Sequence, residues 1–199
     1  MKKTLQEIKR ETLKELFEKI LSSKKVKFEP LEINVKETWD NDFTCVNLSY
    51  KIFEDDECKI VSVCKEDAKG FVDGIFKACY SNFSEEAPSL ANIRLHDYKV
   101  HPSFAKRSSH SCTDAKVKVA VMMDVKDHGI AEFTSVSRSL LHSSFVSILS
   151  AFQFYVNCER SFKKIQMILG DARDRSRADI EQQCMSDLYT LTTVNNYVR

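Results

Sequence analysis

Glycine is scarce in this chain, with four residues out of 199. Long apolar runs are missing as well, and no stretch approaches the ~20 consecutive apolar residues of a membrane-spanning helix. The N-terminal stretch MKKTLQEIKRETLKELFEKIL carries charges every few residues and has no apolar core of a signal peptide. These absences predict a cytoplasmic protein that does not associate with a membrane.

An excess of either charge is also missing. Lys and Arg number 30 against 29 Asp and Glu, while 43% of the residues are hydrophobic. A balanced charge creates no long-range field that would attract nucleic acid. The composition therefore predicts a globular chain with a substantial core and without a nucleic-acid partner.

Metal and cofactor motifs are absent from the sequence. The seven cysteines are odd in number and form no C-x-x-C pair, which argues against a disulfide framework and against a zinc ribbon. The five histidines form no H-x-H and no H-E-x-x-H, and no Walker pattern occurs. His110 and Cys112 lie two residues apart, but no second ligand pair accompanies them. The sequence thus predicts no cofactor and no autonomous enzyme.

Residues 4–22 are expected to form an amphipathic helix within an N-terminal segment of residues 1–25. Thr4 and Glu7 have the spacing of a capping box. The apolar residues of the stretch fall on one face of a helix, namely Leu5, Ile8, Leu13, Leu16, Phe17, Ile20 and Leu21. We expect that face to pack on the chain's own domain or on a partner subunit.

The central region, residues 26–157, repeats one order of elements. VKFEPLEINV, FTCVNLSYKIF and CKIVSVC have the pattern of strands, EDDE is a hairpin loop between the last two, and a helical period follows from Gly70. LANIRLHDYKV, AKVKVAVMMDV and IAEFTSV are again strand-like, and SLLHSSFVSILSAFQFYV is helical. A shift of 69 residues superimposes the apolar positions of the middle strand and of the helix without a gap. We therefore expect an α+β fold of two β-β-β-α units with pseudo-twofold symmetry, at about residues 26–85 and 90–157.

A helical extension is expected over residues 158–199. Gly170 is predicted to end one element, and DARDRSRAD to open a last helix. Arg and Asp are interleaved in that stretch, which is typical of a solvated surface paired with itself rather than of a phosphate site.

Two of the four glycines, Gly70 and Gly74, stand where the first unit turns from strand to helix. A glycine either permits a positive φ or lets another group approach the backbone closely. The unpaired N–H groups of a helix N-terminus can hold a small carboxylate there. Alternatively, Gly70 only eases the turn and Asp73 only favours the helix dipole. Both interpretations remain open on the residues alone.

Three segments resemble the C-terminal regulatory domain of 2-isopropylmalate synthase and of the related citramalate synthase. AKGFVDGIFKA is similar to the G-x-G-P-V-D-A-x-x-K-A motif of that family, and HDYKVHPSF…SCTDAKVKVAV to its D-Y-x-V…G-T-D-A-x-x-x-V-x-V stretch. SVSRSLLHSSFVSILSAFQFYVN is similar to its G-x-S-x-D-I-I-x-A-S-x-x-A-Y-x-x-A-L-N helix. The likeness covers residues 43–157 and includes the duplicated plan. It leaves no room for the family's catalytic barrel, which needs about 250 residues.

The resemblance implies a homodimer that binds leucine or isoleucine, the end product of a branched-chain pathway, and passes feedback inhibition to a separate synthase catalytic subunit. It assigns effector binding to Lys69, Gly70, Phe71, Val72, Asp73, Thr113, Asp114 and Ala115. The helix N-terminus would take the carboxylate of the effector, and Asp73 or Asp114 its ammonium group.

The chain departs from the family's motifs at Ala68, Phe71, Cys112 and Ser139. These departures favour an alternative in which the chain is a structural dimerisation or interaction module that binds no effector. Gly70, Asp73, Thr113 and Asp114 keep the pattern of the motifs and favour the amino-acid-binding regulatory domain.

Overall fold

The computed structural model describes residues 5–38, 40, 43–55, 57–103 and 116–197. Its helices and strands follow one another as α1 (Leu5–Leu21), η1 (Ser22–Lys24), β1 (Lys27–Thr38), β2 (Phe43–Glu54), β3 (Glu57–Ala68), α2 (Phe71–Phe83), η2 (Pro88–Asn92), β4 (Ile93–Ser103), β5 (Lys116–Val125), β6 (Gly129–Ser137), α3 (Leu140–Asp174) and α4 (Ala178–Thr192). The strands form two separate antiparallel sheets, in the orders β1-β2-β3 and β4-β5-β6. The expected α+β fold is confirmed, with two β-β-β-α units between an N-terminal helix and C-terminal helices.

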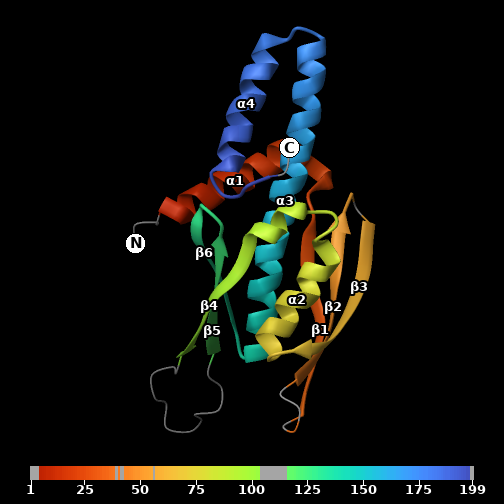
Figure 1. The fold of residues 1–199 in the computed structure, drawn as a ribbon, viewed down its shortest axis with the longest axis vertical. Helices are drawn as coiled ribbons and strands as arrows, with labels where there is room; N and C mark the ends of the chain where they lie inside the picture. Colours follow the sequence, from red (N-terminus) through yellow and green to blue (C-terminus); the bar gives the residue numbers. More distant parts are fainter. Residues whose placement is uncertain (1–4, 39, 41–42, 56, 104–115, 198–199) are drawn as a thin grey trace.

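The two sheets flank the helices α2 and α3 (Figure 1). α2 packs on β2 and β3, whereas α3 packs on β5, β6 and β1. α1 crosses one end of the molecule against α3, and the second half of α3 projects from that end together with α4 as a helical hairpin. Tyr50, Phe145 and Tyr155 are among the largest fully buried side chains of the core. Within the described residues, no helix is both long enough and apolar enough to cross a membrane.

The repeat contains a gap that the sequence comparison did not reveal. α2 begins at Phe71 and α3 at Leu140, 69 residues later as expected, but β2 ends at Glu54 and β5 at Val125, 71 residues later. Strand β3 has 12 residues against 9 in β6, and a register shift opposite residues 44–46 takes up part of this difference. The two offsets differ by two, and side chains alternate along a strand. The same faces therefore point inward in both units.

The glycines at the start of α2 have different roles. Gly70 precedes the helix with φ +123°, a conformation that side-chain-bearing residues rarely adopt. Gly74 is helical, and a Cβ on it would lie 2.4 Å from Cγ2 of Val46 and 3.1 Å from Cβ of Ala68. Gly70 thus allows the turn, and Gly74 allows α2 to approach its own sheet. The close approach at Gly74 is made by the protein itself.

Gly170 does not end a helix, contrary to expectation. α3 continues through it to Asp174, and α4 begins at Ala178 after a short turn. Leu169 and Ala172 are buried on either side of Gly170, and α4 packs back along α3. Packing of this kind outweighs the low helix propensity of a single glycine. One helix therefore runs from the second repeat unit into the C-terminal segment.

Side chains of α3 complete the hydrogen bonding around the start of β1. Asn157 is buried, and its Oδ1 accepts a hydrogen bond from the Val26 N–H at 3.0 Å. Its Nδ2 donates to the Val26 carbonyl at 3.0 Å and to the Gln153 carbonyl at 2.9 Å. One turn earlier on the helix, Oε1 of Gln153 accepts from the Phe28 N–H at 2.6 Å. The helix of unit two thus acts toward this backbone as a neighbouring strand would.

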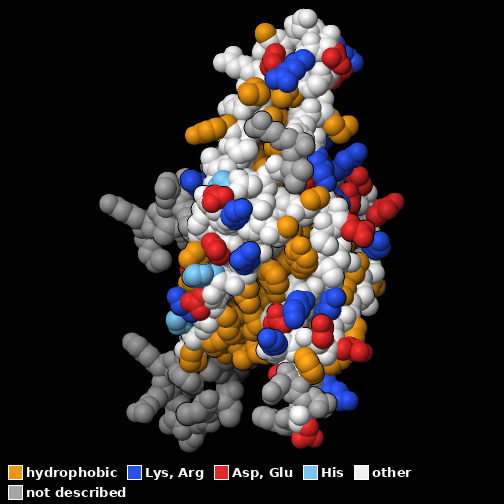
Figure 2. Space-filling model, in the orientation of Figure 1, with side chains coloured by type: hydrophobic (Ala, Val, Ile, Leu, Met, Phe, Trp, Pro, Cys, Tyr) orange, Lys and Arg blue, Asp and Glu red, His pale blue; other side chains and the backbone are white. Residues whose placement is uncertain are grey.

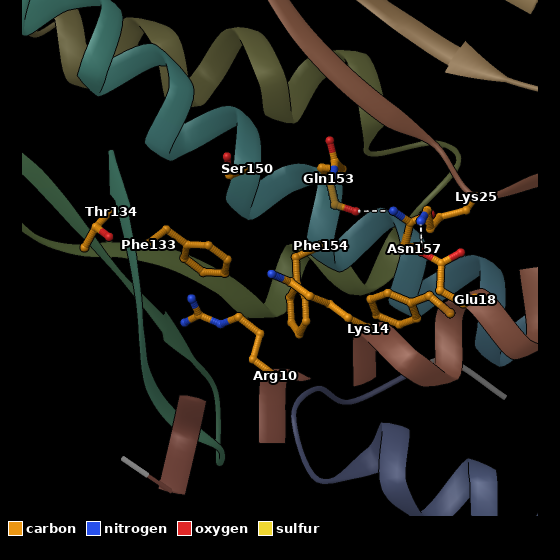
Figure 3. Close-up of a pocket in the computed structure, with 11 residues that line it drawn as sticks. Arg10, Lys14, Glu18, Lys25, Phe133, Thr134, Ser150, Gln153, Phe154 and Asn157 are labelled. Atoms are coloured by element: carbon orange, nitrogen blue, oxygen red, sulfur yellow. Dashed lines mark hydrogen bonds and ion pairs between the residues drawn. The ribbon is translucent and has the colours of Figure 1, made fainter. Parts of the chain in front are cut away.

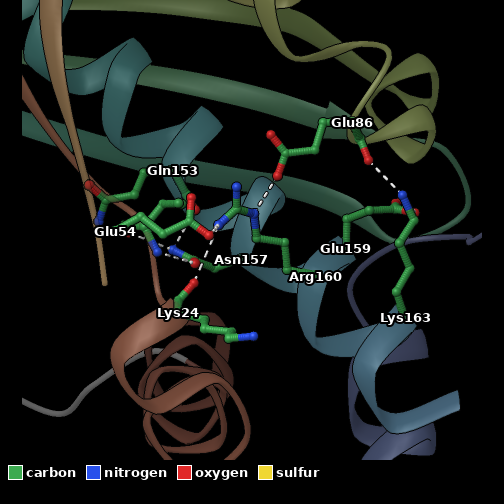
Figure 4. A network of polar contacts seen from close by, with 9 residues as sticks. Lys24, Glu54, Glu86, Gln153, Asn157, Glu159, Arg160 and Lys163 are labelled. Carbon is green, nitrogen blue, oxygen red and sulfur yellow. Dashed lines mark hydrogen bonds and ion pairs between the residues drawn. The ribbon is translucent and has the colours of Figure 1, made fainter. Parts of the chain in front are cut away.

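A network of charges around Arg160 ties the same region together (Figure 4). The guanidinium of Arg160 bonds Glu54 at 2.7 Å, pairs with Glu86, and donates to the Lys24 carbonyl at 3.3 Å. Lys163 donates to the Glu86 carbonyl at 2.6 Å. α3 is therefore joined to the β2–β3 hairpin, to the end of η1 and to the segment between α2 and η2.

Candidate functional site

The predicted effector site at the start of α2 is closed in part by the protein's own contacts. The Asp73 carboxylate accepts a hydrogen bond from the Lys69 N–H at 3.0 Å and pairs with Lys77 Nζ at 2.8 Å. Partial desolvation raises the pKa of Asp73, but the bonds from Lys77 and Lys69 outweigh it and hold that pKa below its ordinary value. Asp73 thus stabilises the first turn of α2, as one of the two interpretations required.

The other predicted residues of this site lie around the same turn. Gly70 has no side chain to cap the first-turn N–H groups of α2, and Lys69 is exposed. Phe71 meets the edge of the Tyr98 ring at 6.1 Å between centroids, and Val72 is half-buried. Thr113, Asp114 and Ala115 lie outside the described residues, as do His110 and Cys112. The structure therefore groups Lys69, Gly70, Phe71, Val72 and Asp73 at one turn.

The equivalent helix start in unit two is capped from within the chain. Oγ of Ser139 accepts a hydrogen bond from the His142 N–H at 3.2 Å. Ser137 Oγ donates to the Ser139 carbonyl at 2.7 Å. Serine side chains thus satisfy this helix end without an external carboxylate.

A cavity of about 360 Å³ lies elsewhere, between α1, β6 and α3 (Figure 3). Three buried aromatic rings, of Phe17, Phe133 and Phe154, form its apolar wall. The Phe154 ring lies 5.7 Å from that of Phe17 and 5.9 Å from that of Phe133, measured between centroids. The volume is in the range of small-molecule sites, which are about 300–1,000 Å³ and mostly apolar with a few polar groups.

Cationic side chains of α1 reach over this apolar wall. Arg10 lies 4.2 Å above the Phe133 ring and donates to the Glu132 carbonyl, so its charge is held in place. Lys14 also lines the cavity, is exposed, and has no ion-pair partner among the residues that the structure describes. Lys25 and Glu18 line the cavity as an ion pair with each other.

Neutral polar groups of α3 and β6 complete the lining. Thr134 and Ser150 contribute hydroxyl groups, and Gln153 contributes its amide. Oε1 of Gln153 is engaged by Phe28, which leaves Nε2 as a donor. Asn157 also lines the cavity, but both of its amide hydrogens and Oδ1 are used by Val26 and Gln153. The cavity therefore combines one unpaired ammonium group, one amide donor and two hydroxyls with an aromatic wall.

The sequence analysis did not find this cavity. It placed Phe17 on the apolar face of the first helix but did not use Arg10 and Lys14. These three residues stand at i, i+4 and i+7, so they form one stripe of a helix. Cations on the stripe that carries a buried aromatic ring were the available signal. Gln153 and Ser150 gave none, because their part of the helix pattern is that of ordinary surface positions.

Catalytic groups are not brought together among the described residues. No group of three or more His, Cys, Asp or Glu side chains with the geometry of a metal site occurs in that part of the chain. Burial raises the pKa of the Cys79 thiol and of the Cys158 thiol well above the ordinary value. Buried neutral thiols of this kind are structural rather than nucleophilic.

No protein-family model and no curated protein matches the chain. The resemblance to the regulatory domain of 2-isopropylmalate synthase accordingly remains a prediction from the quoted motifs.

Proposed function

We propose that the chain is a non-catalytic regulatory domain that binds a small aliphatic carboxylate, of the class of leucine, isoleucine and their 2-oxo acids. The cavity beneath α1 carries this proposal. Lys14 provides a charge and donor for a carboxylate, and Phe17, Phe133 and Phe154 provide an apolar wall for an aliphatic chain. A pocket for such a ligand needs little more than these two parts.

The position of the cavity also supports regulation. Its lining comes from α1 on one side and from β6 and α3 on the other, so a bound molecule would link the N-terminal helix to both the sheet and the helix of unit two. Binding would thereby favour one position of α1 over others, which is the differential interaction that regulation requires. Following the resemblance, we propose a separate synthase catalytic subunit as the partner that responds.

Thermal unfolding with and without ligand tests this proposal. Millimolar leucine, isoleucine, valine or one of their 2-oxo acids is expected to raise the unfolding temperature, since a ligand at a hundredfold excess over its Kd stabilises the native state by about 2.7 kcal/mol. Lys14→Met should weaken binding at least tenfold. Lys69→Met is the matched control, because it removes a lysine at the start of α2 and leaves the cavity intact.

The reverse result with these two variants would move the ligand to the start of α2, where the resemblance places it. Loss of binding in Lys69→Met and not in Lys14→Met would contradict the assignment to the cavity. Absence of any shift with all six compounds would contradict the proposed function itself.

A second candidate function, homodimerisation, is favoured by an apolar area beside α2. Phe71, Val72 and Tyr98 are half-buried there, and Val100 on β4 is 40% exposed. Figure 2 shows hydrophobic side chains gathered over α2 and the adjoining strand. Such an area is larger than the scattered apolar residues of an ordinary surface and marks an interface. A second copy of the chain, as the resemblance implies, would cover it on both molecules at once.

Sedimentation velocity tests dimerisation. The unaltered chain is expected to sediment as a dimer, and Val100→Lys to sediment as a monomer, because an ammonium group in the apolar area cannot be desolvated cheaply. Ile60→Lys is the control, since Ile60 is 61% exposed on β3, in the other sheet. A monomeric unaltered chain at all concentrations would rule out this second function.

A further inference from the structure

The charges that line the cavity beneath α1 are unequal. Arg10, Lys14 and Lys25 are cationic, and Glu18 is the single carboxylate among the described lining residues. Glu18 is already paired with Lys25. Arg10 and Lys14 therefore leave the cavity with an uncompensated positive charge, which attracts an anion and repels a cation over short distances.

The hydrogen-bonding groups have the same bias. Lys14 Nζ and Gln153 Nε2 are donors, and Gln153 Oε1 is occupied by the Phe28 N–H. Asn157 has no amide group left for a ligand. The hydroxyls of Thr134 and Ser150 are the remaining side-chain groups of the lining that can accept. An ammonium group carries three donors and no acceptor, so it would be poorly satisfied here.

A carboxylate meets the opposite conditions. It only accepts hydrogen bonds, and the lining offers a charged donor and an amide donor for it. A second oxygen beside the carboxylate, such as a 2-oxo group, can accept from a hydroxyl. The aliphatic end needs only the aromatic wall of Phe17, Phe133 and Phe154.

We infer that the cavity selects aliphatic carboxylates without an ammonium group, so that the 2-oxo acid of a branched-chain amino acid binds in preference to the amino acid. This inference rests on the proposed function and names the ligand class of its site. The domain would then report the level of a 2-oxo acid, the deaminated form of an amino acid, rather than of the amino acid itself.

Four probes of one carbon skeleton separate the charges. Isothermal titration is carried out with 4-methyl-2-oxopentanoate, 4-methylpentanoate, leucine and 3-methylbutylamine. The 2-oxo acid and the plain carboxylate are expected to bind at least tenfold more tightly than leucine, and the amine is expected not to bind. Lys14→Met should reduce binding of both carboxylates at least tenfold. Lys59→Met, which removes an exposed lysine of β3, should leave their binding unchanged.

The possible failures are distinguishable. Leucine binding as tightly as the 2-oxo acid, or more tightly, would overturn the inference while the proposed function stood. Binding of no probe at millimolar concentration would overturn both. Carboxylate binding that survives Lys14→Met would overturn the assignment of the selectivity to this cavity.

Discussion

Replacing Asn157 by leucine is expected to destabilise the protein by about 2–5 kcal/mol. The Val26 backbone is buried, and the Asn157 amide supplies partners for both its N–H and its carbonyl. Leucine has a similar volume but leaves these two groups unpaired, and each buried unpaired group costs about 1–3 kcal/mol. Urea unfolding followed by circular dichroism measures the change.

Two further variants make the Asn157 result specific. Asn157→Asp keeps the acceptor for the Val26 N–H but turns a carboxylate toward two carbonyls, so it should be no more stable than the leucine variant. Asn47→Ala removes an exposed asparagine of β2 and should change the free energy of unfolding by less than about 0.5 kcal/mol. If Asn157→Leu were as stable as the unaltered chain, the helix would not be holding the start of β1.

Alanine is expected to have opposite effects at Gly74 and Gly170, although both are helical. At Gly74 the new Cβ would meet Cγ2 of Val46 at 2.4 Å, and crowding of this kind costs about 1–3 kcal/mol. At Gly170 no atom lies within 4 Å, so the variant should gain up to about 1 kcal/mol from helix propensity alone. Thermal unfolding of the two variants side by side gives the comparison.

A compensating change tests the cause at Gly74. Val46→Ala removes the methyl groups that the new Cβ would strike, so the double variant should be more stable than the sum of the two single changes predicts. Equal stabilities of Gly74→Ala and Gly170→Ala would mean that α2 can move away from its sheet without cost.

Most of the fold was predictable because it depends on local patterns. Alternation in residues 46–52 and the helical period after Gly70 gave the order of elements, and their recurrence gave the duplication. The end at Gly170 was predicted wrongly, because helix propensity is local whereas the packing of α4 on α3 is not. The gap in the repeat was hidden because offsets of 69 and 71 leave the same strand faces inward.

The candidate site was less predictable for a physical reason. The cavity beneath α1 is formed by segments more than 100 residues apart, and a single sequence holds no record of which helix crosses which sheet. Asp73 illustrates the other limit. Its place at the start of α2 was expected, but only the structure shows that Lys69 and Lys77 already engage its carboxylate.

The bonds from Asn157 and Gln153 to Val26 and Phe28 bear on how the chain folds while it is being made. The first sheet depends on side chains 125 and 131 positions further along the chain. A ribosome adds about 5–20 residues per second, so this backbone would wait on the order of ten seconds for its partners. During that interval the first repeat would expose a sheet that its own half of the gene cannot complete. Each half of the duplication has thus lost the independence that an ancestral single unit would have needed.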